Sequence, residues 1–224
     1  MRWRCAPTPT VRSSPIPTFE RPIDRLVTLG YPTLAGTSEE ELRELVEPLR
    51  SQADAITGAD SPSRVRFVLV VTRDVVPPES TVPLLRLSGP RGLGEKPGKV
   101  DRNHAEGDLA DYHPIAGCEP PGMAYLLVDV ERGEEFRNVR PEDATGTIRS
   151  RGRSPLTIDE GIALVTQVPQ VLEKNRCFML AGSRRHDRRV PALWISENAP
   201  KLGWCWDGNP HTWLGTASSG SRLG

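Results

Sequence analysis

The sequence lacks three features that would assign the chain to a protein class at once: a long apolar run, a net charge and a paired-cysteine motif. No apolar run approaches the roughly 20 residues that a membrane-spanning helix needs, so we expect no membrane span. Lys and Arg total 29, and Asp and Glu also total 29, so no overall positive field would draw the protein to nucleic acid. Two arginine-rich segments, 149–153 and 184–189, are interpreted as solvated turns, and no nucleic-acid partner is expected.

Cysteine usage points to a reducing compartment. The chain has four widely spaced cysteines and no C-x-x-C motif; they are Cys5, Cys118, Cys177 and Cys205. Residues 1–17 contain arginine and proline but no apolar stretch of the kind found in secretory signals. We therefore expect free thiols and a cytoplasmic protein.

Neither a nucleotide loop nor a metal site is predicted. The glycine-rich stretch GPRGLGEKPGK fails the Walker A spacing, because Leu93 stands where the first Gly is required and no Ser or Thr follows Lys99. His104 and His113 lie near three aspartates, but no predicted element there would hold ligands in the geometry that a metal requires. We expect no metal and no cofactor.

Hydrophobic spacing predicts helices near the start and in the second half of the chain. Residues 23–29 place apolar side chains at helical spacing. The segments Ser38–Glu41 and Thr157–Glu160 each have the pattern of a capping box, in which a hydroxyl and a glutamate satisfy the first N–H groups of a helix. Each box precedes a stretch with apolar residues at helical spacing.

Two continuous apolar runs, Val65–Val71 and Met123–Val130, predict central strands that are covered on both faces. Three further strand-like runs follow at 176–181, 190–196 and 202–206. Helices therefore cluster before the first strand and before a C-terminal tryptophan-rich hairpin, and they do not alternate regularly with strands. This order predicts the α+β class, as a single domain with a mixed or antiparallel sheet.

The boundaries of this domain are predicted from composition. The proline-rich and hydroxyl-rich residues 1–18 are expected to form a disordered N-terminal arm. The single domain is expected to span residues 19–217, with a long flexible loop at about 88–122 where glycine, proline and charge dominate. Residues 218–224 are expected to fray.

The most unusual segment is Val190–Leu214, which holds four of the five tryptophans. Pairing its two apolar runs across residues 197–200 places Trp194 opposite Gly203, an aromatic-over-glycine contact. The strand period of two then predicts that Trp204 and the next tryptophan, two residues later, point to one side and are largely buried. An Asp-Gly-Asn-Pro turn follows and presents further polar groups beside these indoles.

Three interpretations of this segment remain open. The first is a ligand-binding surface, because aromatic walls with a few convergent polar groups suit sugars, bases or cations. Its candidate residues are Trp204, Trp206, Asn209, His211 and Trp213. The second is an enzyme with a cleft near Cys205, Asp207 and His211, in which the imidazole would activate the thiol. The third is a structural or interaction protein without a pocket, in which the tryptophans fill the core.

Several stretches also resemble an uncharacterised bacterial family that is known only as a domain of unknown function. The similar stretches are GYPTLAG, AYLLVDVERGEEF, RSPLTIDEGIALVTQ, and RRVPALWIS with PKLGWCWDGNPHTWLG. The resemblance covers roughly residues 19–217 and leaves out the N-terminal arm and Arg91 to Gly107. It implies a bacterial, cytoplasmic protein but supplies no reaction, cofactor or site residue. The leading expectation is therefore a protein that binds an unknown small molecule or protein partner at the tryptophan-rich surface.

Overall fold

The computed structural model describes residues 19–90 and 92–224, so the arm expected at 1–18 lies outside the described residues. The helices in this part of the chain are α1 (Glu20–Thr28), α2 (Tyr31–Ala35), α3 (Glu39–Val46), α4 (Arg50–Ala55), α5 (Pro78–Thr81), α6 (Pro141–Ser150) and α7 (Ile158–Gln167). Short 3-10 helices are η1 (Glu47–Leu49), η2 (Val82–Leu84), η3 (Asp108–Asp111), η4 (Glu134–Phe136) and η5 (Pro169–Val171).

The strands are short apart from four. They are β1 (Arg64–Val71), β2 (Ser88–Gly89), β3 (Gly92–Leu93), β4 (Lys99–Val100), β5 (His113–Pro114), β6 (Ala124–Glu131), β7 (Ser154–Pro155), β8 (Cys177–Met179), β9 (Ser183–Arg184), β10 (Arg189–Ser196), β11 (Ala199–Trp206), β12 (Leu214–Thr216), β13 (Ser218–Ser219) and β14 (Ser221–Leu223). No helix in the described part of the chain is both long and apolar enough to cross a membrane.

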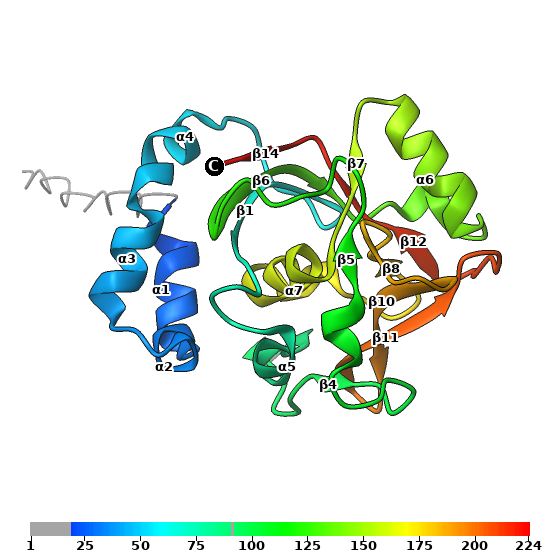
Figure 1. Ribbon diagram of the computed structural model, residues 1–224, viewed down its shortest axis with the longest axis horizontal. Coiled ribbons are helices and arrows are strands. Elements are labelled where there is room, and N and C mark those ends of the chain that lie inside the picture. The colour runs from blue at the N-terminus through cyan, green and yellow to red at the C-terminus, as the bar shows by residue number, and fades with distance from the viewer. Residues whose placement is uncertain (1–18, 91) are drawn as a thin grey trace, which may run out of the picture.

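The elements are layered around helix α7 (Figure 1). Strands β1, β6, β7, β13 and β14 form an antiparallel sheet, called here the β1–β6 sheet. Strands β4, β8, β10, β11 and β12 form a mixed sheet, called here the β10–β11 sheet. Helix α7 lies between the two sheets and shares one core with both, while helices α1–α4 cover the other face of the β1–β6 sheet. This arrangement confirms the predicted α+β class.

The capping boxes and the two strong strands form as predicted. Ser38 and Thr157 each accept a hydrogen bond from the third residue of their helix, whose glutamate bonds back to the cap. Strands β1 and β6 pair with each other, and the pleat sends Leu69 towards the N-terminal helices and Val68 towards α7. Strand β1 lies at the edge of its sheet, however, so the prediction that it is a central strand was wrong. The carboxamide of Gln167 bonds both backbone groups of Leu69 and covers that edge.

The segment at 88–122 was expected to be a long flexible loop, but it packs on the β10–β11 sheet. Strand β4 within it pairs with β11, and β5 pairs with β9. Leu109 and Tyr112 are buried, and Asp108 lies 3.3 Å from Arg185. Glycine and proline predict turns, but they do not predict whether those turns contact residues far away in the chain.

The C-terminal residues 218–224, expected to fray, are built into the β1–β6 sheet. Strands β13 and β14 both pair with β6. The Arg222 guanidinium meets the fully buried carboxylate of Glu160 at 2.6 Å and 2.9 Å, and the Tyr125 hydroxyl donates to the same carboxylate at 2.8 Å. The expectation failed because this ion pair joins residues 62 positions apart, beyond the reach of local composition.

We predict that Arg222→Ala lowers the free energy of unfolding by about 3–5 kcal/mol, because it leaves the Glu160 carboxylate buried without its counter-charge. Urea unfolding of both chains measures the difference. Arg102→Ala is the matched control, since Arg102 is exposed and its loss should change stability by less than about 0.5 kcal/mol. An unchanged urea midpoint for Arg222→Ala would contradict the anchoring role.

Candidate functional site

The tryptophan-rich hairpin forms, with a register that differs from the prediction. Its turn has only two residues, Glu197 and Asn198, with φ of 54° and 60°, as in the tight turns that suit twisted hairpins. Trp194 therefore faces Lys201, two residues from the predicted partner. A shift of two preserves the face on which each side chain lies. The contact with Gly203 survives on the diagonal, because the indole of Trp194 fills the space that a Cβ would need there.

Trp204 and Trp206 lie on one face of the hairpin, but they are not both buried. Their rings pack edge to face with centroids 5.1 Å apart. Trp204 is half-buried: its indole N–H donates to the backbone oxygen of Asn103, and the Arg189 guanidinium lies 4.5 Å from its ring centroid. Trp206 is 45% exposed, so the prediction that it is largely buried was wrong. Strand alternation fixes the face of a side chain but does not decide whether another element covers that face.

The other predicted site residues divide between two places. Asn209 is exposed, and its backbone N–H donates to the backbone oxygen of Trp206. His211 and Trp213 instead form a group with Trp194. The ring centroids of His211 and Trp213 are 5.6 Å apart, and those of Trp213 and Trp194 are 6.2 Å apart. Trp194 projects from the face of the hairpin opposite to Trp204. The expected single surface is thus divided into two aromatic groups, a pair and a group of three rings, and its role in ligand binding stays a prediction.

The geometry does not favour a thiol site at this hairpin. Cys205 is 8% exposed, faces the core, and its Sγ lies 3.3 Å from the Met179 sulfur. Burial raises the pKa of this thiol to about 12, so it stays protonated at neutral pH. Asp207 is paired with Arg184 at 3.0 Å, and burial lowers the pKa of His211. Within residues 19–90 and 92–224, no group of three or more His, Cys, Asp or Glu side chains is placed to hold a metal ion.

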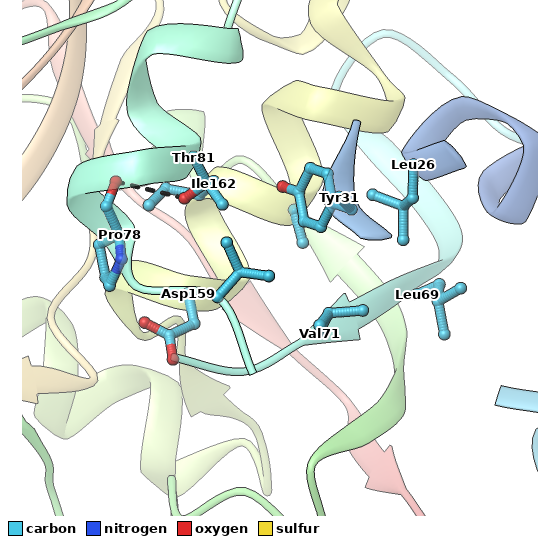
Figure 2. A pocket seen from close by; sticks show the side chains of 10 residues that line it. Leu26, Tyr31, Leu69, Val71, Pro78, Thr81, Asp159 and Ile162 are labelled. Carbon is cyan, nitrogen blue, oxygen red and sulfur yellow. Dashed lines mark hydrogen bonds between the residues drawn. The ribbon is translucent and has the colours of Figure 1, made fainter. Parts of the chain in front are cut away.

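A small cavity behind helix α7 is closed to anything larger than water. Figure 2 shows it between α1, α2, the end of β1 and the first turn of α7, with the Tyr31 hydroxyl directed towards Thr81 and Ile162. Its volume is about 10 Å³, which is close to the minimum for one water molecule. Burial raises the pKa of Tyr31 to about 12, so this hydroxyl is neutral. The cavity can hold a structural water but no organic ligand.

A larger groove runs along the outer edge of strand β1. It has a volume of about 530 Å³, which lies in the range of small-molecule sites. Helix α1, the loop before β1, β1 itself and the end of α7 form its walls. The lining residues are Arg21, Pro22, Arg25, Asp60, Ser61, Pro62, Val65, Arg66, Phe67, Gln167, Val168 and Gln170.

The charge of the groove is positive. Arg21 and Arg25 lie four residues apart, so they share one side of helix α1. Neither makes an ion pair with a carboxylate of the described residues, and residues 1–18 contain no Asp or Glu. Arg66 does pair with Asp60, at 3.4 Å. Three arginines therefore stand against one aspartate in the lining.

Arg25 is the most constrained of these arginines. It is half-buried, and its Nε donates to the backbone oxygen of Thr166 at 3.2 Å. Burial lowers the pKa of Arg25, and repulsion from Arg86 lowers it further. A partly buried cation without a counter-charge opposes folding, unlike the many arginines of this chain that are paired. Beside it, the half-buried Phe67 and Val168 supply apolar surface.

Sequence reasoning did not find this groove. Its one local signal is the spacing of four between Arg21 and Arg25 on a predicted helix, which is common on solvated helix faces. The feature that makes these arginines unusual is that neither pairs with a carboxylate of the described residues, and it depends on how α1 docks beside β1. That information is not present in any single segment.

Comparison with known families gives one result. The family described as "Family of unknown function (DUF5701)" matches residues 25–224. The chain belongs to this family. The match confirms the resemblance of the stretches quoted in the sequence analysis. It begins at residue 25, later than expected, and extends through residues 218–224. No curated protein and no solved structure matches the chain.

We predict that iodoacetamide at pH 8 leaves Cys118, Cys177 and Cys205 unmodified in the folded protein, because all three are buried and the pKa of each thiol is raised. Peptide mass mapping reports each cysteine separately. The same reaction in concentrated urea is the control, in which all three should be alkylated. Rapid alkylation of Cys205 in the folded chain would contradict this and revive the thiol site.

Proposed function

We propose that this DUF5701 protein binds a small organic anion in the groove along strand β1. The ligand carries a carboxylate or phosphate group and an apolar body. The anionic group contacts Arg21 and Arg25, and the apolar body lies over Phe67 and Val168. The observation that carries the proposal is a pair of arginines that make no ion pair with the described residues, in a groove large enough for such a ligand.

The electrostatics of the whole chain support this choice. The protein has no net charge, so a local excess of arginine is not the by-product of a basic composition. Arginines elsewhere in the described chain are mostly held by acidic side chains, as Arg43 and Arg50 are on the neighbouring helices. A guanidinium presents a fork of donors that matches carboxylate and phosphate oxygens. A bound anion would supply the counter-charge that Arg25 lacks.

Other surfaces support the proposal less well. The cavity behind α7 is too small for a ligand, at about 10 Å³. The paired indoles of Trp204 and Trp206 are an exposed surface, and the second aromatic group lies on the opposite face of the hairpin. We keep that surface as a predicted secondary contact for a protein partner.

The binding test uses phenyl phosphate and benzoate as probes, with benzamide as the uncharged control. Titrations followed by calorimetry or by amide shifts should show saturable binding of the two anions and none of benzamide. Binding should weaken as salt is raised, because the contact is electrostatic. Binding of benzamide as tight as that of benzoate would show an apolar pocket in which the arginines play no part, and would overturn the proposal.

We predict that Arg25→Gln weakens binding of phenyl phosphate by about tenfold or more, which corresponds to the loss of one charged hydrogen bond. Arg21→Gln should weaken it in the same direction. Arg102→Gln is the matched control, because Arg102 is exposed and lies outside the groove. Thermal melts should show Arg25→Gln as stable as the unchanged chain to within about 1 kcal/mol, since its charge has no partner to lose. Equal affinities of Arg25→Gln and Arg102→Gln would contradict the assignment.

We further propose a bacterial origin and a cytoplasmic location. The resemblance of the quoted sequence stretches to a bacterial family supports a bacterial origin. The cytoplasmic location is supported by three unpaired thiols, which are usual in a reducing compartment; they belong to Cys118, Cys177 and Cys205. Fractionation of producing cells tests the location, and recovery of the chain outside the cytoplasmic fraction would overturn it.

A further inference from the structure

The outer edge of strand β1 is open where it meets the arginine groove. Within the part of the chain that the structure describes, β1 pairs with one strand, β6, and its other edge faces away from the sheet. An edge strand presents backbone N–H and C=O groups that a further strand can bond. Arg66 and Phe67 of β1 line the groove together with helix α1. The groove therefore lies directly against an unpaired sheet edge.

The backbone of Phe67 points to this open edge. Along an antiparallel strand, successive residues alternately bond the partner strand and point away from it. The Gln167 carboxamide accepts from the Leu69 N–H at 3.0 Å and donates to the Leu69 oxygen at 2.6 Å, so Leu69 points away from β6. Phe67 lies two residues earlier in the same uninterrupted register and points the same way.

The residue opposite on β6 supports this orientation independently. Phe67 stands in register with Val128. The Val128 oxygen accepts from the Gly220 N–H at 2.9 Å, on the side of β6 that carries β14, so it is turned away from β1. The N–H and C=O of Phe67 thus have no hydrogen-bond partner within residues 19–90 and 92–224. Because Phe67 is only half-buried and lines the groove, these two groups are available to a ligand there.

The Gln167 side chain shows which chemistry this edge accepts. Its carboxamide offers one donor and one acceptor to Leu69, as a peptide group of a neighbouring strand would. Gln167 also lines the groove. The next outward-facing residue along β1 is Phe67, which has no such amide beside it. The edge is therefore bonded to an amide at one position and free to bond another at the next.

We infer that the anion bound in this groove is the C-terminal end of a short, extended peptide. The inference rests on the proposed function, since the terminal carboxylate is the anionic group that Arg21 and Arg25 hold. Backbone groups of the peptide donate to the Phe67 oxygen and accept from the Phe67 N–H, so the ligand extends the sheet by one short strand. Its last side chain is the apolar body beside Phe67 and Val168.

A peptide satisfies more of the groove than a simple anion does. A carboxylate or phosphate alone contacts the arginines and leaves both backbone groups of Phe67 without a partner. An unpaired backbone group that loses water on binding is costly, so a ligand that bonds these groups as well is favoured. The groove volume of about 530 Å³ suits a peptide of a few residues, and it is too small for a folded domain.

The binding test uses the acetylated tripeptide Ala-Val-Phe with a free C-terminal carboxylate. Its controls are the same peptide as a C-terminal amide, and two peptides methylated in turn on the valine and the phenylalanine nitrogen. Calorimetric titration of the full chain should show the free acid binding about tenfold or more tighter than benzoate. The amide and at least one methylated peptide should bind about tenfold more weakly than the free acid, because each loses one strong contact.

Hydrogen exchange of single amides tests the strand contact directly. Saturating free-acid peptide should slow exchange of the Phe67 N–H by about tenfold or more, because that N–H gains a partner. Saturating benzoate should leave its rate unchanged. The Val68 N–H is the control, since Val68 points to β6 and is bonded within the sheet with or without ligand.

The outcomes separate this inference from the proposed function. If both methylated peptides bind as tightly as the free acid, or if the Phe67 N–H exchanges at the same rate with bound peptide, the peptide assignment is overturned while the anion groove stands. If neither benzoate nor the free acid binds, or if the peptide amide binds as tightly as the acid, the anion groove itself is overturned, and the peptide assignment with it.

Discussion

The placement of helix α7 between two sheets is the constraint on which the rest of the structure depends. One side of the helix faces the β1–β6 sheet and another faces the β10–β11 sheet, so nearly all of its side chains are buried. Such a position is possible only with close backbone contact, and Gly161 provides it, because a Cβ there would overlap the Leu180 side chain. The first turn is held by the buried Glu160, whose charge is matched by Arg222 from the end of the chain. The folded C-terminus and the interior helix therefore stabilise each other.

The two cavities follow from the ends of the same helix. Its first turn borders a cavity of about 230 Å³, where Arg73 is paired with Asp159. Its last residue, Gln167, covers the edge of β1 and borders the groove in which neither Arg21 nor Arg25 pairs with a carboxylate of the described residues. A paired arginine and two arginines without an ion pair among the described residues thus lie at opposite ends of one buried helix. Because the whole chain is electrically neutral, these differences are local and arise from where each charge is paired.

Local sequence patterns predicted the elements well and the sites poorly. The capping boxes at Ser38 and Thr157, the buried strands β1 and β6 and the C-terminal hairpin all form, because each depends on neighbours within a few residues. The hairpin register was missed by two residues, since two-residue and four-residue turns are both compatible with Glu-Asn-Ala-Pro. The predicted tryptophan surface divides over two faces, because Trp213 packs with Trp194 and not with Trp204.

The amino-acid sequence by itself determined the class of fold, the faces of the strands and membership of the DUF5701 family, because these depend on periodicity and on long stretches of similar residues. Only the tertiary structure decided which charges are paired. Arg222 and Arg25 look alike in the sequence, yet Arg222 pairs with a buried carboxylate and Arg25 pairs with none among residues 19–90 and 92–224. The same holds for Thr72, which follows an ordinary strand in the sequence, but whose hydroxyl the fold buries with no hydrogen-bond partner among the described residues. Ion pairs and hydrogen bonds between distant segments form only when whole helices and strands dock against one another, and no local sequence pattern predicts that docking.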